Sequence, residues 1–179
     1  MDCRAWRGNP AGRPSAYSER SCQESRALPL RSSEAIMISP TSMQELFADT
    51  AHWIALQSPG DELHAAVLGL LDYISVGFTI VTSELVLFEF LNHFSGRGSF
   101  ARRTASSTWH HLHSNPNVII IPSTKALLEE AAKTYSKHAD KAWSFTDCSS
   151  FAIMRERKIH EALIADYHFE QAGFRALLR

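Results

Sequence analysis

From residue 44 onward, the chain alternates short hydrophobic runs with longer segments in which hydrophobic residues recur every three or four positions. Short runs are typical of buried strands, and the longer pattern is typical of amphipathic helices. The runs that predict strands are residues 46–49, 78–81, 118–121 and 162–165. The segments that predict helices are residues 62–75, 83–94, 100–113, 124–137 and 144–156, followed by two short elements at 168–172 and 174–178.

This alternation predicts an α/β fold with a parallel sheet that is flanked by helices on both faces, because parallel strands need crossover helices to connect them. Ligands bind such sheets at the carboxyl ends of the strands. Asp49 and Asp166 each end a predicted strand, and Asp147 stands near the amino end of a predicted helix. We therefore expect these three acids to converge on one edge of the sheet.

The composition of the chain changes near residue 36. Residues 1–36 are rich in Gly, Pro and Ser, show no hydrophobic period, and contain six Arg and no Lys. We predict that residues 1–43 form a disordered or non-native extension and that residues 44–179 form the folded domain. An RNA-binding tail is the alternative interpretation of the arginines. Removal of residues 1–36 is expected to leave folding and activity intact.

Length, composition and charge narrow the class of protein. A chain of 179 residues that is 45% hydrophobic can bury one full core. No hydrophobic run approaches the roughly 20 residues that cross a bilayer, so we expect a cytoplasmic protein without a membrane partner. Three cysteines without CxxC spacing favour neither a disulfide framework nor a structural zinc site. The formal net charge of -1 excludes a globally basic nucleic-acid-binding protein but allows a local basic strip.

Four acidic residues stand in hydrophobic sequence surroundings, and none has a Lys or Arg within four positions. They are Asp49, Glu89, Asp147 and Asp166. A buried ionised carboxylate destabilises a fold strongly unless a cation or hydrogen bonds compensate it. Hard divalent cations such as Mg²⁺ are the natural compensation. The pattern therefore predicts a metal-binding carboxylate pocket.

Four sequence strings around these acids resemble the PIN domain, and most closely the toxin-type ribonucleases of the VapC group. The strings are FADT at 47–50, VTSELVLFE at 81–89, SFTDCSSF at 144–151 and DYHFEQAGF at 166–174. The resemblance spans nearly all of residues 44–179. It implies a PIN-like fold with a five-stranded parallel sheet, a Mg²⁺- or Mn²⁺-dependent endoribonuclease that acts on RNA, and a homodimer held inactive by a small antitoxin protein.

The chemistry of RNA hydrolysis suits the four acids. The reaction needs an activated water and a counter-charge for the phosphate, and one or two metal ions held by carboxylates supply both. We assign Asp49 and Asp147 as metal ligands and Asp166 as the acid that completes the cluster. Glu89 is assigned as a ligand or as the base that orients the attacking water.

Two threonines and three arginines extend the predicted site. Thr50 and Thr146 have hydroxyl groups adjacent to the acids, so we expect them to hydrogen bond to a carboxylate or to a metal-bound water. Arg97, Arg102 and Arg103 form the best basic strip of the domain and are expected to meet an RNA backbone or an acidic partner. An ordinary solvated loop is an equal alternative for the arginines.

Each acid also has a structural interpretation. Ser144 and Asp147 match a capping box, in which the Asp satisfies backbone donors, and this role can coexist with metal binding. Asp49 and Asp166 could be turn-forming residues at strand ends. Glu89 could lie on an exposed stripe of its helix.

The histidines are expected to be structural. His168, two residues beyond Asp166, is given no role in the site. His110, His111 and His113 lack the one-face spacing of a metal site, so an exposed helix end is favoured.

Two function classes follow from the sequence. The main hypothesis is a metal-dependent endoribonuclease of the toxin type that cuts single-stranded or loop RNA. The alternative is a catalytically silent PIN-like module that binds RNA or a protein partner. The four acids favour the enzyme, because a silent module has no reason to keep a mutually repelling cluster. A haloacid-dehalogenase-like phosphatase needs a second Asp where Ala51 stands, which counts against that interpretation.

Overall fold

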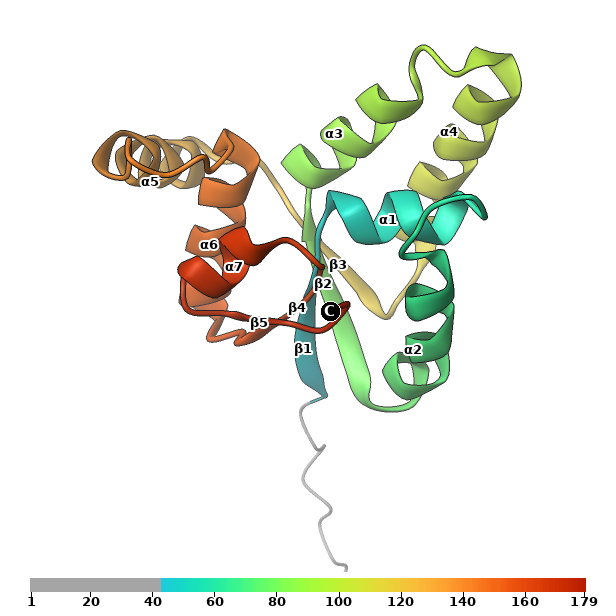
Figure 1. Cartoon of the computed structure of the whole chain (residues 1–179), viewed down its shortest axis with the longest axis horizontal. Helices are drawn as coiled ribbons and strands as arrows, with labels where there is room; N and C mark the ends of the chain where they lie inside the picture. Colours follow the sequence, from blue (N-terminus) through green and yellow to red (C-terminus); the bar gives the residue numbers. More distant parts are fainter. Residues whose placement is uncertain (1–42) are drawn as a thin grey trace, which may run out of the picture. The chain divides into compact units, whose positions relative to one another are not determined.

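The computed structural model describes residues 43–179 (Figure 1). This part of the chain contains five strands and seven helices. The strands are β1 (Gln44–Ala48), β2 (Phe78–Ser83), β3 (Val118–Ile121), β4 (Glu161–Leu163) and β5 (Arg175–Ala176). The helices are α1 (Thr50–Gln57), α2 (His64–Gly77), α3 (Glu84–Phe94), α4 (Gly98–Ser114), α5 (Lys125–Lys137), α6 (Phe145–Arg157) and α7 (Tyr167–Gln171). The predicted extension lies outside the described residues, apart from Met43.

The five strands form one parallel sheet in the order β3-β2-β1-β4-β5. The central strand β1 pairs with β2 on one side and with β4 on the other, so Phe47 stands between Val81 and Ala162. Helices α1, α2 and α4 lie on one side of the sheet, and α5, α6 and α7 lie on the other (Figure 1). The predicted α/β fold with a five-stranded parallel sheet is confirmed.

The core lies on both faces of the central strands. Leu46, Phe47 and Ala48 of β1 are almost fully buried. This explains the continuous hydrophobic run, because a parallel strand covered by helices has no solvent-facing side. On the α6 side, the ring of Phe151 packs edge-on against Phe169, with centroids 5.0 Å apart. This aromatic contact fixes α6 against α7, and these two helices carry two of the four predicted acids.

Side-chain caps fix where three helices begin. Ser83 accepts a hydrogen bond from the backbone N–H of Val86 at the start of α3. Thr124 and Ser144 have the same role at the starts of α5 and α6. Such caps satisfy backbone donors that have no partner inside the helix. Because Ser83 ends β2 and caps α3, strand and helix follow one another without a loop.

Helix α1 was not predicted from the sequence. Its eight residues have no continuous polar face, since Thr50, His52, Trp53 and Ala55 are all buried. No side-chain hydrogen bond caps its first turn either. A short helix that is buried on most sides lacks the period that reveals an amphipathic helix. The other predicted elements exist with shifted ends, and only residues 175–176 of the segment 174–178 form a strand.

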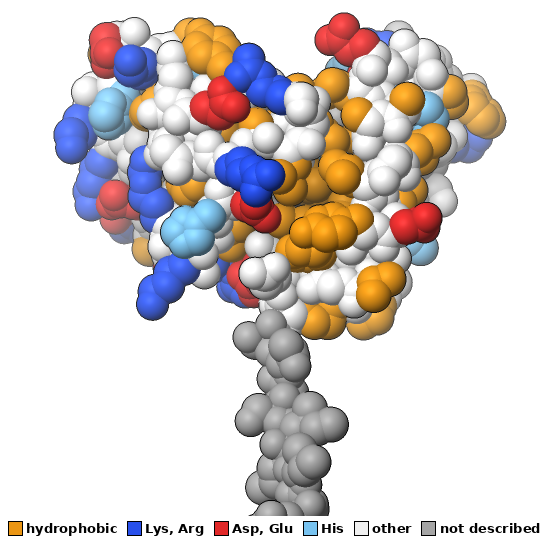
Figure 2. Space-filling model, turned by 60° about the horizontal axis from the view of Figure 1, so that its bottom comes forward, with side chains coloured by type: hydrophobic (Ala, Val, Ile, Leu, Met, Phe, Trp, Pro, Cys, Tyr) orange, Lys and Arg blue, Asp and Glu red, His pale blue; other side chains and the backbone are white. Residues whose placement is uncertain are grey.

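Charged and hydrophobic side chains are separated on the surface. Figure 2 shows Lys and Arg side chains gathered on the side of α5 and α6 and hydrophobic side chains on the side of α2. Leu68, Tyr73 and Val76 of α2 are 46%, 58% and 86% exposed. Within residues 43–179, no helix combines the length and hydrophobicity that membrane crossing requires.

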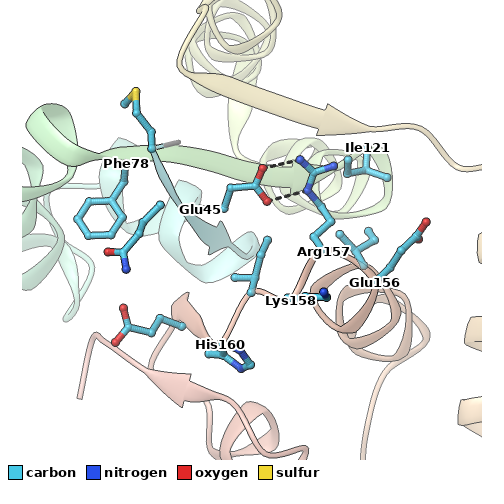
Figure 3. A pocket seen from close by; sticks show the side chains of 12 residues that line it. Glu45, Phe78, Ile121, Glu156, Arg157, Lys158 and His160 are labelled. Atoms are coloured by element: carbon cyan, nitrogen blue, oxygen red, sulfur yellow. Dashed lines mark hydrogen bonds and ion pairs between the residues drawn. The ribbon is translucent and has the colours of Figure 1, made fainter. Parts of the chain in front are cut away.

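A hollow of about 820 Å³ lies at the amino ends of β1, β2 and β4. Glu45 and Arg157 form a two-pronged ion pair in its wall, in which Arg157 Nε donates to Glu45 Oε2 over 2.8 Å (Figure 3). The pair ties β1 to the last turn of α6. None of the four predicted acids lines this hollow. The hollow is therefore a feature of the opposite end of the strands from the acids.

Candidate active site

Two of the predicted acids follow neighbouring strands at the same edge of the sheet. Asp49 comes directly after β1 and is the N-cap residue of α1. Asp166 follows β4 and is the N-cap residue of α7. Because β1 and β4 are paired and parallel, their carboxyl ends open on the same side. The topology thus brings together two acids that are far apart in the sequence.

Two helices bring the other acids to this edge. Asp147 stands in the first turn of α6, and Glu89 stands in the middle of α3. Both carboxylates lie close enough to Asp49 for their negative charges to raise its pKa, and Asp166 has the same effect on Asp147. The four acids therefore share one electrostatic neighbourhood.

Asp49 has the least solvent contact of the four, with 7% of its surface exposed. Its Oδ1 is buried and has no hydrogen-bond partner in the described part of the chain. Burial, followed by the charges of Asp147 and Glu89, raises the pKa of Asp49 from 3.8 to about 7, although nearby backbone N–H groups oppose the shift. Burial disfavours the ionised form and repulsion adds to it. A cation at Oδ1 would reverse both effects.

Glu89 is hydrogen bonded but exposed. The hydroxyl of Thr50 donates to Glu89 Oε2 over 2.9 Å. Phe90 and Leu87 turn into the core, whereas Glu89 lies on the solvent-facing stripe of α3. This agrees with the alternative of an exposed stripe of the helix, because successive residues of a helix point about 100° apart. Thr50 holds the side chain toward Asp49 from the first turn of α1.

Asp147 closes a capping box at the start of α6. Ser144 Oγ accepts from the N–H of Asp147 over 2.9 Å, and the N–H of Ser144 donates to Asp147 Oδ2 over 2.7 Å. Burial raises the pKa of Asp147, the hydrogen bonds with Ser144 and the nearby His168 oppose the rise, and Asp166 adds to it. The structural interpretation of Asp147 is thus correct, and it leaves Oδ1 free of the capping box.

Asp166 and His168 form a compact turn at the start of α7. The N–H of His168 donates to Asp166 Oδ1 over 3.0 Å. His168 Nδ1 lies 3.2 Å from Asp166 Oδ2 and 3.6 Å from Asp147 Oδ2. The side chain of Asp166 is 43% exposed, and its place as the N-cap residue of α7 agrees with the interpretation of a turn-forming residue at a strand end. The contact of His168 was not predicted from the sequence; its signal is the spacing of two residues after an N-cap Asp, which folds the side chain back.

The set of donors suits a hard divalent ion. It consists of carboxylates, one of which has a buried oxygen without a partner. Oxygen ligands of this kind are those that Mg²⁺ and Mn²⁺ prefer. As the side chains stand in residues 43–179, no three His, Cys, Asp or Glu residues are grouped around a single point. The partners described above hold the carboxylates of Glu89, Asp147 and Asp166, and their assignment as ligands stays a prediction.

The remaining predicted residues make no hydrogen bond to the four acids in the described part of the chain. Thr146 precedes Asp147, and its backbone carbonyl accepts a hydrogen bond from Ser149 Oγ. The strip of Arg97, Arg102 and Arg103 is exposed and lies where α3 passes into α4, at the end of these helices remote from the sheet (Figure 1). The structure thus separates the basic strip from the acids.

The histidines near the end of α4 follow the structural expectation. His110, His111 and His113 are exposed in its last turns, and His113 Nδ1 contacts the carbonyl of Trp109 over 2.8 Å. They belong to α4, whereas Asp49 and Asp166 follow β1 and β4, and Glu89 and Asp147 lie on α3 and α6.

Comparisons with known proteins identify the class. The family model of the PIN domain matches residues 46–175, and the chain belongs to this family. It is similar to the 23S rRNA-specific endonuclease VapC20 of two strains of Mycobacterium tuberculosis, with 30% identity over 129 residues that cover 72% of this chain and 95% of the relative.

A solved structure supports the same assignment. The crystal structure of Mycobacterium tuberculosis VapC20, described as a Sarcin-Ricin loop cleaving toxin, superimposes with a TM-score of 0.64 at 30% identity, over 72% of this chain and 95% of that chain. The predicted resemblance to the VapC-like PIN-domain ribonucleases is confirmed, and with it the class of toxin-type ribonucleases.

Proposed function

We propose that this PIN-domain ribonuclease is a Mg²⁺- or Mn²⁺-dependent endoribonuclease whose site is built from Asp49, Glu89, Asp147 and Asp166. The observation that carries the proposal is the buried Oδ1 of Asp49, which lacks a hydrogen-bond partner among the described residues and lies beside like charges. Such a carboxylate is costly without a cation and becomes favourable with one.

The metal ion supplies a counter-charge for the phosphate and lowers the pKa of water. Asp49 and Asp147 would hold it through the oxygens that the protein leaves without backbone partners. Ser144 fixes Asp147 through Oδ2, which leaves Oδ1 without a backbone partner. Thr50 orients Glu89, whose exposed carboxylate can accept a proton from the attacking water. Asp147 and Glu89 thus each have a separate neighbour that sets the direction of the carboxylate.

The substrate of the relative indicates the class of RNA. VapC20 is named for cleavage of 23S rRNA, the alignment covers 95% of its length, and the PIN family match at residues 46–175 includes all four acids. We propose a loop of large-subunit ribosomal RNA as the substrate of the present chain. A loop suits the site, because unstacked nucleotides expose their backbone to an edge-of-sheet pocket in a way that a duplex does not.

A small antitoxin protein and a homodimer are proposed as partners. Both rest on the VapC resemblance. The cytoplasmic location stays a prediction of the same kind, and ribosomal RNA is the substrate that such a location would offer.

The test compares the wild type with Asp147→Asn and with the control Asp140→Asn. The asparagine of the first variant keeps a side-chain oxygen that can accept from the N–H of Ser144, so the capping box survives while the charge is lost. Asp140 is an exposed acid paired with Lys141 outside the site. Each protein is incubated with intact ribosomes and with purified large-subunit RNA in Mg²⁺, Mn²⁺ or EDTA, and the fragment ends are mapped.

Cleavage at one position by the wild type and by Asp140→Asn is expected, with loss in EDTA and in Asp147→Asn. Cleavage that persists in EDTA contradicts the metal-dependent mechanism. Folded wild-type protein that cuts neither substrate in any metal favours the silent binding module instead.

A further inference from the structure

We propose that His168 is a positioning residue that sets the carboxylates of Asp147 and Asp166 for metal binding through its Nδ1 atom. The inference rests on the proposed function, because it concerns the same site. It adds a residue that the sequence analysis regarded as merely structural.

Nδ1 of His168 lies between two carboxylates. It lies 3.2 Å from Asp166 Oδ2 and 3.6 Å from Asp147 Oδ2. At 3.2 Å the distance alone would allow a hydrogen bond, but the nitrogen makes none that meets the angular criteria, and it is buried. We interpret this as a nitrogen aimed between two acceptors. Since both neighbours are acceptors, Nδ1 is the ring nitrogen that carries hydrogen.

The backbone of His168 helps to fix the position of this ring. The N–H of His168 donates to Asp166 Oδ1, so the same residue contacts both oxygens of one carboxylate, one through the backbone and one through the ring. The side chain of His168 is only 15% exposed, and its ring packs at 4.7 Å from that of Tyr167. A ring held in this way has little freedom to turn Nδ1 away.

His168 is the basic side chain beside Asp147 and Asp166. In residues 43–179, every ion pair of Asp147 and of Asp166 is with His168. Asp147 Oδ2 already accepts from the N–H of Ser144. His168 Nδ1 faces the same oxygen at 3.6 Å, so Asp147 has a polar neighbour on two sides of Oδ2. Polar groups that orient metal ligands typically alter metal affinity by about tenfold to a hundredfold.

The test uses three variants of the full chain. His168→Asn places an amide nitrogen near the position of Nδ1, whereas His168→Gln places it near that of Nε2, and both keep a polar side chain. His168→Phe keeps the ring without any donor. His160→Phe is the matched control, since His160 is exposed at the opposite end of β4 (Figure 3).

The primary readout is the affinity for Mn²⁺, measured by calorimetry without RNA. We expect His168→Phe and His168→Gln to bind Mn²⁺ about tenfold or more weakly, and His168→Asn and His160→Phe to bind like the wild type. In cleavage assays the same two weak variants should lose kcat with little change in KM. Thermal unfolding in EDTA controls for folding. If His168→Phe does not fold, the difference in Mn²⁺ affinity between His168→Asn and His168→Gln tests the proposal.

Equal Mn²⁺ affinity of His168→Asn and His168→Gln overturns the proposal, since a purely structural ring would not distinguish them. Wild-type affinity in His168→Phe overturns it as well. Failure of the proposed function gives a different result: the wild type then binds Mn²⁺ and cleaves no RNA, while the ranking of the His168 variants in the binding assay remains.

Discussion

At the scale of single residues, Asp49 couples the site to the stability of the fold. Its pKa is raised from 3.8 to about 7, mainly by burial. Between these values the folded protein binds a proton that the unfolded chain has lost, so the free energy of unfolding falls as pH rises through this range. The group that prepares the site for a cation is thus destabilising when the cation is absent.

We therefore predict that Asp49→Asn stabilises the protein in EDTA and abolishes cleavage. At about pH 8 the free energy of unfolding should rise by on the order of 2 to 4 kcal/mol, because the amide is neutral at every pH, and near pH 4 the two proteins should be equal. Urea unfolding across this range measures the difference. A variant that is less stable at high pH, or that still cleaves RNA, excludes Asp49 as the buried ligand.

His52 has a pH dependence of the opposite sign. It is 3% exposed, its Nδ1 is buried without a hydrogen bond in the described residues, and burial lowers its pKa from 6.5 to about 4. Between these values the unfolded chain binds a proton that the folded protein does not, so stability is lost as pH falls. The two residues lie three positions apart and titrate over nearly the same pH range, with opposite effects on stability.

We predict that His52→Phe reduces the loss of stability on acidification in EDTA. The change from about pH 7 to about pH 4 should be smaller than in the wild type by roughly 2 to 3 kcal/mol. Phe keeps a ring of similar size against Trp53, which packs edge-on at 4.8 Å. Parallel acid-unfolding curves of the two proteins would show that the pKa of His52 is not lowered in the fold.

The four acids could be found from the sequence, but their surroundings could not. Asp49 and Asp166 were visible because each follows a hydrophobic run at a strand end. For Glu89 the sequence left a buried ligand and an exposed stripe open, because its neighbours in the chain are hydrophobic on both sides, and the structure shows it exposed. The contact of His168 with Asp147 joins two helices and is set by tertiary packing, which no local pattern records.

At the scale of elements, the first turn of α6 has two tasks. It is capped by Ser144, and the acid that closes the cap is also a predicted ligand. The sequence could indicate this box because both members lie within four residues. It could not indicate α1 in the same way, because that helix lacks a capping side chain and a polar face. Local motifs were therefore recoverable, whereas a short buried helix was not.

We predict that Ser144→Ala lowers both stability and metal affinity. Loss of the cap should reduce the free energy of unfolding by about 1 kcal/mol. The backbone N–H at position 144 remains, but the first turn loosens and Asp147 is held less firmly, so Mn²⁺ binding should weaken too. Ser144→Thr, which keeps a capping hydroxyl, is the control in thermal unfolding and calorimetry. Equal behaviour of Ala and Thr at this position would argue against any coupling of cap and site.

At the scale of the whole molecule, the parallel topology makes the site possible. The order β3-β2-β1-β4-β5 places β1 in the centre, and its carboxyl end meets that of β4. The sequence predicts this arrangement only as a class, since alternating strands and helices do not state the order of strands. The order decides which acids become neighbours; the resemblance to the PIN domain implied the number of strands, and the structure shows their order.

The domain from residue 44 onward should be sufficient for folding and catalysis. All five strands and seven helices of the described chain lie within it, and the PIN family match begins at residue 46. We therefore predict that a chain starting at Met37 unfolds at the same temperature as the full chain and cleaves RNA at the same site. Differential scanning calorimetry and the cleavage assay measure both. The salt dependence of RNA binding separates the two interpretations of the six removed arginines. Each phosphate contact makes RNA affinity fall more steeply with salt concentration, so a weaker salt dependence in the shortened chain identifies an RNA-binding tail. An equal salt dependence identifies an extension without that role. An insoluble or inactive shortened protein would show that the domain boundary lies nearer the amino terminus than the hydrophobic pattern indicates.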